Sequence, residues 1–106
     1  MTWYDGIVDI RSFPVPPSAS EYESLIVDDT MAELTAATYG DAIRAMITVE
    51  DHPMRFRIDG GDPAADEGHL VDDGDVIPLA SAADIANFRA IRTTGDSATI
   101  RVTYYE

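Results

Sequence analysis

Alternating apolar and polar residues between Ala42 and the C-terminus constrain the fold of this chain more than any other feature. Apolar side chains recur at every second position in residues 42–50, and the same period returns in residues 54–59 and 98–105. A period of two places successive side chains on opposite faces of a β-strand. Turn segments rich in Gly, Asp and Pro separate the alternating runs. The pattern predicts a compact all-β domain.

The alternation also predicts which side chains face the core. The connection at residues 51–53 is short, so we expect a hairpin between the strands at 42–50 and 54–59. The last strand, at 98–105, is expected to bury one face and expose the other. The residues predicted to point inward are Ile43, Ala45, Ile47, Val49, Met54, Phe56, Ile58, Ala98, Ile100, Val102 and Tyr104.

Further elements complete the predicted domain, which spans residues 25–106. Short strands are expected at 25–27, 70–71, 76–80 and 88–92. Ser81 is expected to cap a helical turn at 81–86, whereas residues 35–39 favour an extended or irregular segment. Seven or eight strands, with turns roughly every 8–12 residues, indicate a β-sandwich or jelly-roll-like single domain.

Residues 1–24 differ from the rest and are predicted to form an extended arm. Pro14, Pro16 and Pro17 fix the backbone angle φ and remove amide donors, which disfavours both a helix and a central strand. A disordered terminus is the alternative. The apolar residues of the first ten positions favour docking, either on this domain or on a neighbouring subunit.

The charge balance excludes some classes of partner. Twenty acidic residues face seven basic ones, all arginine, for a net charge of −13. Nucleic acids and anionic membranes are bound through Lys and Arg, so neither is an expected partner.

The 106 residues contain no cysteine, and no apolar run approaches the roughly 18 residues of a transmembrane helix. The first residues lack the basic region of a signal peptide, and we expect synthesis in the cytoplasm.

An acidic segment from Asp59 to Asp75 is the first candidate for a cation site. It contains seven acidic residues and no lysine or arginine. Carboxylates on glycine-rich turns can bind calcium, and the candidate ligands are Asp62, Asp66, Asp73 and Asp75. The spacing matches no EF-hand or repeat-type calcium loop, which favours a structural use of Asp and Gly in turns.

The sequence contains no recognisable catalytic motif. His52 and His69 are the only histidines, and their separation does not fit a His-based zinc motif. No Gly-x-Ser-x-Gly motif is present. We therefore expect neither an enzyme nor a bound cofactor.

The candidate interface residues are aromatic, aliphatic and arginine side chains expected to point outward. Tyrosine and tryptophan combine an apolar ring with a polar atom, and arginine suits persistent ion pairs, so both kinds are common at interfaces. Phe56, Phe88 and Tyr104 are instead assigned to the core. The candidates are Trp3, Tyr4, Ile7, Phe13, Arg55, Arg57, Arg101 and Tyr105.

Residues 35–106 resemble a group of small virion proteins of tailed bacteriophages. The resemblance lies in the segments ITVED (47–51), MRFRIDGGDP (54–63), Gly68-His69, DGD (73–75), ANFRAIRTTGD (86–96) and ATIRVTYY (98–105). Such proteins resemble capsid decoration, or cement, proteins with a β-sandwich or jelly-roll fold. The resemblance implies no catalytic residue.

The resemblance implies a structural role on the capsid surface of a virion assembled in the host cytoplasm. The implied partners are the major capsid protein and further copies of this chain, as a homotrimer or homodimer. A head–tail connector or head-fibre component is an alternative within the same class. A calcium- or carbohydrate-binding β-sandwich module is an alternative from a different class.

Overall fold

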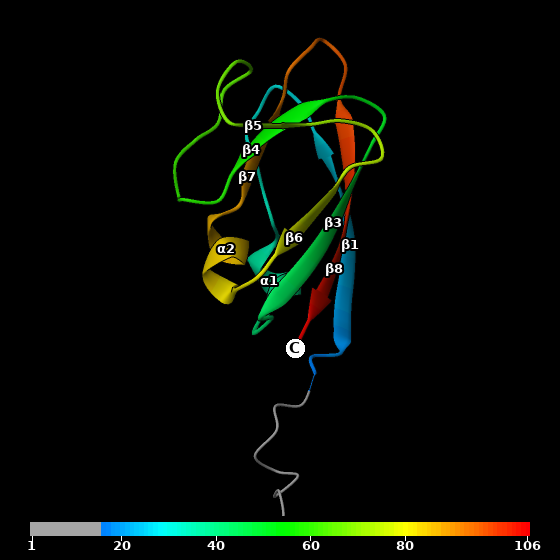
Figure 1. The fold of residues 1–106 in the computed structure, drawn as a ribbon, viewed down its shortest axis with the longest axis vertical. Coiled ribbons are helices and arrows are strands. Elements are labelled where there is room, and N and C mark those ends of the chain that lie inside the picture. Colours follow the sequence, from blue (N-terminus) through cyan, green and yellow to red (C-terminus); the bar gives the residue numbers. More distant parts are fainter. Residues whose placement is uncertain (1–15) are drawn as a thin grey trace, which may run out of the picture.

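The computed structural model describes residues 16–106, in which eight strands and two short helices follow one another (Figure 1). Every pair of neighbouring strands is antiparallel. The elements are β1 (Ala19–Val27), β2 (Ala32–Glu33), α1 (Ala36–Tyr39), β3 (Arg44–Glu50), β4 (Met54–Arg57), β5 (His69–Val71), β6 (Val76–Leu79), α2 (Ala82–Asn87), β7 (Arg89–Arg92) and β8 (Ala98–Tyr105). The all-β prediction is confirmed.

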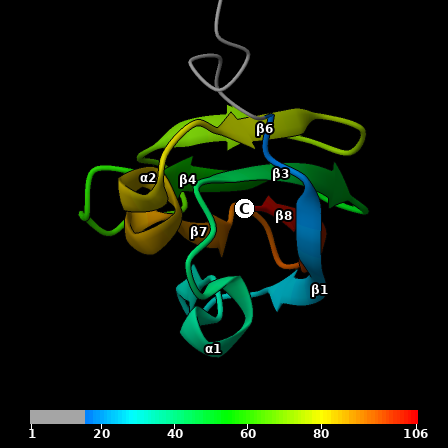
Figure 2. The same cartoon turned by 90° about the horizontal axis from the view of Figure 1, so that it is seen from below.

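The strands form two four-stranded sheets. The first has the order β1-β8-β3-β6, and the second has the order β2-β7-β4-β5. In the end-on view of Figure 2, β1 lies on one side of the domain, and β4 and β7 lie on the other. Apart from β4 and β5, the strands that pair are not consecutive in the chain, so the tertiary fold sets most of the pairing.

The core lies between the sheets and confirms most of the predicted inward side chains. Strand β8 contributes its alternate residues Ala98, Ile100, Val102 and Tyr104, all 0% exposed. Phe56 and Ile58 are half-buried and pack against this core rather than within it. The prediction that Ile43 is buried is wrong, since it is 48% exposed and lies just before β3, outside the strand.

One helix was predicted and the other was not. Ser81 caps α2 as expected, and its hydroxyl accepts a hydrogen bond from the backbone N–H of Asp84. The prediction of extended backbone at residues 35–39 is wrong, because Ala36–Tyr39 form the single turn of α1. Two backbone N–H groups in this turn donate to the carbonyl of Thr35, which closes the turn despite the modest helix propensity of Thr and Tyr.

The predicted hairpin between residues 42–50 and 54–59 is wrong. Strand β3 pairs with β6 and β8, whereas β4 pairs with β5 and β7 in the other sheet. The short connection therefore crosses from one sheet to the other. Asp51, at its start, has a φ of +79°, a backbone conformation that Asp adopts more readily than most residues.

The predicted limit of the arm at residue 24 falls inside a strand. Residues 19–27 form β1, which pairs with β8 along its whole length. The first four residues of β1 are exposed, so no alternation of buried and exposed positions marks this part of the strand in the sequence. The sheet therefore begins at Ala19. Residues 1–15 lie outside the described part of the chain.

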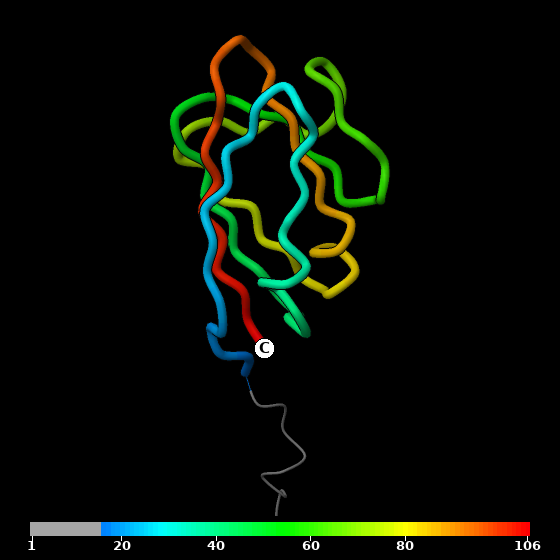
Figure 3. Tube along the Cα trace, turned by 180° about the vertical axis from the view of Figure 1, so that it is seen from behind, coloured from blue at the N-terminus to red at the C-terminus, as the bar shows by residue number. Residues whose placement is uncertain are grey.

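The two ends of the domain are formed by different parts of the chain. The connections after β1 and after β7 lie together at the end opposite the C-terminus (Figure 3). Ser18 and Glu106 exchange two backbone hydrogen bonds of 3.0 Å at the other end, so the described chain enters beside the point where it ends. Within residues 16–106, no helix has the length and apolar character needed to cross a membrane.

Candidate docking surface

The outward face of the β1-β8-β3-β6 sheet carries an apolar row. The strand register aligns Tyr22 of β1 with Thr103 of β8, Met46 of β3 and Pro78 of β6. Tyr22 is 57% exposed and Met46 is 41% exposed. The outward face of an antiparallel sheet is ordinarily polar, so a row with apolar side chains on three of its four strands, beside Thr103 of β8, is unusual.

A second row runs parallel to the first and adds one exposed apolar side chain, that of Val76. It aligns Ser24, Arg101, Thr48 and Val76, and Val76 is 55% exposed. Ile26, farther along β1, is 61% exposed. We call this surface the apolar sheet face. It is defined by Tyr22, Ile26, Met46, Val76, Pro78 and Tyr105.

Arg101 lies near the middle of the apolar sheet face and is held by its neighbours. Its Nε donates to the Glu50 carboxylate at 2.8 Å, and its Nη1 donates to the Ser24 hydroxyl at 3.0 Å. The Glu50 carboxylate raises the pKa of Arg101, so this side chain stays charged. Hydrogen bonds with Ser24 and Arg101 lower the pKa of the Tyr22 hydroxyl. The polar groups on this face are therefore ordered while the apolar groups are uncovered.

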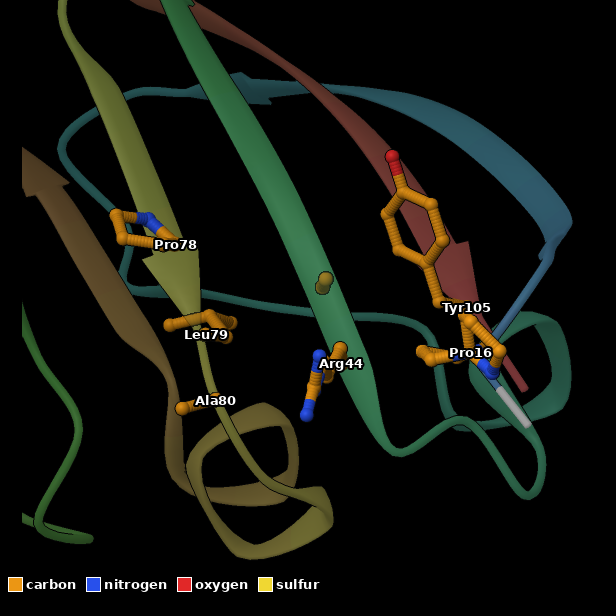
Figure 4. Close-up of a pocket in the computed structure, with 8 residues that line it drawn as sticks. Pro16, Arg44, Pro78, Leu79, Ala80 and Tyr105 are labelled. Atoms are coloured by element: carbon orange, nitrogen blue, oxygen red, sulfur yellow. The ribbon is translucent and has the colours of Figure 1, made fainter. Parts of the chain in front are cut away.

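A pocket of about 490 Å³ lies at the end of the apolar sheet face nearest the entry of the chain (Figure 4). Pro16 lies beside Tyr105 on one side of β3, and Pro78 and Leu79 of β6 lie on the other. The backbone hydrogen bonds between Ser18 and Glu106 place Pro16 and Pro17 at this point. The walls are mainly apolar, which suits an aromatic or aliphatic side chain.

Arg44 is the charged residue of this pocket. It is exposed, and no carboxylate of residues 16–106 forms an ion pair with it. Arg57, Arg89, Arg92 and Arg101, by contrast, each pair with an acidic side chain. In a chain with a net charge of −13, such an arginine can accept a carboxylate from a partner.

The predicted interface residues fall into three groups. Arg101 and Tyr105 lie on the outward face described above. Arg55 and Arg57 lie on the other sheet, where both donate hydrogen bonds to the 59–68 loop of their own chain. Their expected role at an interface stays a prediction. Trp3, Tyr4, Ile7 and Phe13 lie outside the described residues.

The 59–68 loop is held by arginines from β4 and β7. Arg57 Nη2 lies 2.6 Å from the Asp59 carboxylate, and Arg89 donates to the carbonyl of Gly60. The hydrogen bond from Arg57, together with one from the Gly61 N–H, lowers the pKa of Asp59 to about 2. The sequence indicated a polar face for these arginines but not that they fasten a loop.

The four predicted calcium ligands do not come together as one group. Asp62 and Asp66 lie in the 59–68 loop, whereas Asp73 and Asp75 lie in the turn before β6. In that turn, Asp73 accepts from the Asp51 N–H, and Asp75 accepts from the Asp72 N–H. No cluster of three or more potential metal-ligating side chains occurs among residues 16–106. The carboxylates of this turn serve as acceptors for backbone donors.

A second opening lies between the edges of the two sheets. It has a volume of about 340 Å³ and is lined by residues of β4, β5 and β6, among them Phe56, His69 and Val76. The rings of Phe56 and His69 are 5.3 Å apart. This cleft shares Pro78 and Leu79 of its lining with the pocket at Pro16.

The sequence prediction missed most of the apolar sheet face. Tyr22 was assigned to the arm, and Met46 and Val76 were expected only as members of alternating strands. A signal was present, because apolar residues occupied outward positions of those strands, as Met46 does between Ala45 and Ile47. That signal becomes a surface only when the register places Met46 beside Pro78.

The comparisons with known proteins identify no relative. No family model matches this chain, and no characterised protein or solved structure matches it either.

Proposed function

We propose that the chain is a structural protein of a virus particle that decorates and stabilises the capsid through subunit contacts. The observation that carries the proposal is the apolar sheet face, an ordered but uncovered surface across four strands. Exposed apolar patches of this kind mark protein interaction sites. The proposal assigns the chain no catalytic activity and no cofactor.

The finer proposal for the fold is a jelly roll. The antiparallel neighbours include β1 with β8, β2 with β7, β3 with β6 and β4 with β5. This is the pairing of one long hairpin that has been rolled up into two sheets. Jelly rolls recur in viral capsid and lectin domains, which supports a virion role by analogy of fold alone.

The proposed partners are the major capsid protein and further copies of this chain, as a homotrimer or homodimer. Closed symmetric assemblies of this kind are common among soluble oligomers. The residues before Ala19 are proposed to act as an arm that contacts a neighbour. An arm beside an exposed apolar face gives each subunit two surfaces through which to join others.

The test is the location of the chain in purified particles. Antibodies raised against the chain should label intact particles from the virus that encodes it, and the chain should co-purify with the major capsid protein in a density gradient. Label over the whole head supports decoration, whereas label at one vertex supports the connector or fibre alternative. Absence from purified particles despite presence in the lysate would overturn the proposal. Antibody absorbed with purified chain is the control.

A ligand-binding module is the second candidate, and the cleft between β5 and β6 favours it. Its lining includes the aromatic rings of Phe56 and His69, and aromatic rings supply apolar contact area for a ligand. A glycan array probed with the full chain tests this candidate. Binding that Phe56→Ala abolishes, while Tyr22→Ala leaves it unchanged, supports the module; a blank array contradicts it.

A further inference from the structure

The pocket beside Pro16 and the apolar sheet face together indicate what covers them. We propose that residues 3–13 of one copy of the chain bind across the apolar sheet face of a second copy, with an aromatic side chain of that segment in the pocket. The segment contains Trp3, Tyr4, Ile7, Val8, Ile10 and Phe13, which match the apolar character of the surface.

The position of the prolines directs this segment toward a neighbour. Ser18 is fixed to Glu106 by two backbone hydrogen bonds, so the chain reaches Pro17 at the end of the sheet. Each residue that precedes a proline favours extended backbone, and this holds for Phe13, Val15 and Pro16. In this extended form the five residues 13–17 would span roughly 15 Å, at about 3.1 Å per residue. A spacer of this length would carry the segment past its own pocket.

The segment is long enough to cross a neighbouring sheet. Fifteen residues precede Pro16, and an extended chain advances at most about 3.3–3.6 Å per residue, or roughly 50 Å in all. Strand β8 has eight residues, which corresponds to about 27 Å. The spacer and the apolar segment together therefore exceed the length of the face that they would cover.

Alternation within the segment suits binding to a sheet surface. In an extended conformation Tyr4, Val8 and Ile10 share one apolar side, whereas the other side combines Asp5 and Asp9 with the apolar residues Trp3, Ile7 and Phe13. The apolar side can pack against the row that contains Met46 and Pro78. The mixed side then lies at the edge of the contact, with Asp5 and Asp9 within reach of a basic group.

The charges on the face complement those of the segment. The outward side chains of β3 and β8 include two arginines, Arg44 and Arg101, and one glutamate, Glu50. Glu21 of β1 lies beside Tyr22 and Thr103, and the Asp51 carboxylate accepts a hydrogen bond from the Thr99 hydroxyl. Arg101 is paired with Glu50, which leaves Arg44 to receive Asp5 or Asp9. Arg44 is therefore a specific contact point on this face for an acidic side chain of a second copy.

The inference rests on the proposed role in subunit contacts but not on the identity of the particle. It concerns contacts between copies of the purified chain, which can be measured without a capsid. Failure of the binding experiment below with successful labelling of particles would overturn only this inference. Association of the purified chain as expected, together with its absence from purified particles, would overturn only the virion assignment.

The experiment uses two full-length variants that each lack one half of the contact. The first, the segment donor, carries Met46→Asp in the middle of the face and keeps its N-terminal residues. The second, the face donor, carries Trp3→Ser, Tyr4→Ser and Val8→Ser and keeps its face. Trp3 is the only tryptophan of the chain, so tryptophan fluorescence in a mixture comes from the segment donor alone.

We expect the wild-type chain to be oligomeric by native mass spectrometry and each variant alone to be monomeric. Mixing the two variants should restore a complex and shift the Trp3 emission to shorter wavelength, in a manner that depends on concentration. Arg44→Glu in the face donor should weaken the complex by about tenfold or more, because it replaces attraction by repulsion.

Three results would overturn the inference: a monomeric wild-type chain, a mixture that fails to associate, or a short-wavelength emission that is independent of concentration. The last would mean that the segment binds its own domain. Leu70→Asp, at an exposed apolar position of β5 on the other sheet, is the matched control and should leave association unchanged. Circular dichroism verifies folding, and Tyr22→Asp replaces Met46→Asp should that variant fail to fold.

Discussion

The hydroxyl of Tyr104 donates a hydrogen bond to the Oε2 atom of Glu23 at 2.5 Å. The bond joins β8 to β1 across the inner side of the first sheet, and the same oxygen accepts the backbone N–H of Thr35 at 3.2 Å. Glu23 therefore links the last strand, the first strand and the start of α1. The ring of Tyr104 is fully buried and lies 6.0 Å from the ring of Tyr39, measured between centroids.

Removing the Tyr104 hydroxyl should destabilise the fold without a packing defect. Tyr104→Phe keeps the buried ring but deletes a hydrogen bond to a carboxylate, a kind of bond worth about 1.5–3 kcal/mol. We expect the free energy of unfolding in urea to fall by about 1–2 kcal/mol, because Glu23 keeps its bond from Thr35. Tyr22→Phe, on the exposed face, is the control and should change it by less than about 0.5 kcal/mol. Equal losses for the two variants would contradict the assignment.

The same tyrosine should make the fold sensitive to alkaline pH. Burial, and next the hydrogen bond to Glu23, raise the pKa of Tyr104 above its ordinary value of 10.0. A raised pKa means that the unfolded state releases its proton first, so the stabilising contribution is complete below pH 10 and declines as the pH rises above it. Unfolding in urea between pH 8 and pH 11 should show this decline, and Tyr104→Phe should reduce it. An unchanged slope in the variant would argue against Tyr104 as the source.

Asp59 should stay ionised in acid. Arg57 and the Gly61 N–H lower its pKa to about 2, so its contribution to stability is present above the ordinary carboxyl pKa near 4 and is lost as the pH falls toward 2. The carboxyl carbon signal of Asp59, followed by NMR from pH 6 to pH 1.5, should report that midpoint. Arg57→Ala should move the midpoint toward 4. Arg55→Ala removes an arginine that contacts other loop atoms and should leave the midpoint in place.

Gly68 should resist substitution where Gly95 does not. Gly68 has a φ of +126°, and a Cβ there would lie 3.1 Å from the carbonyl oxygen of Phe56. Gly68→Ala should therefore destabilise the fold by about 1–3 kcal/mol. Gly95 has no such φ and no atom within 4 Å of an added Cβ, so Gly95→Ala should be neutral or stabilise the fold by up to about 1 kcal/mol. Thermal melting of both variants measures the difference, and a Gly68→Ala variant as stable as the wild type would contradict the argument.

Local patterns predicted local structure. The alternation in residues 98–105 predicted the buried side of β8 correctly at all four positions. Ser81 and Asp84 predicted the start of α2, because a capping bond involves residues three positions apart. These features depend on near neighbours, so the sequence contains the information they require.

Those local patterns could predict neither which strands pair with each other nor which side chains share a surface. The strands at 42–50 and 54–59 were recognised, but they belong to different sheets, because alternation says which side chains are buried and not which strand lies alongside. The start of β1 was missed, since its first residues are exposed and owe their extended form to hydrogen bonds with β8.

The candidate docking surface likewise depends partly on the local sequence and partly on the tertiary structure. By itself the sequence determined an all-β chain, strongly acidic, with turns made by Gly and Asp and an apolar N-terminal segment. Only the tertiary structure decided that Tyr22, Met46 and Pro78 form one row and that Pro16 lies beside Tyr105. The physical reason is that a strand satisfies its backbone hydrogen bonds with partners that can be distant in the chain, and those partners determine which side chains share a face.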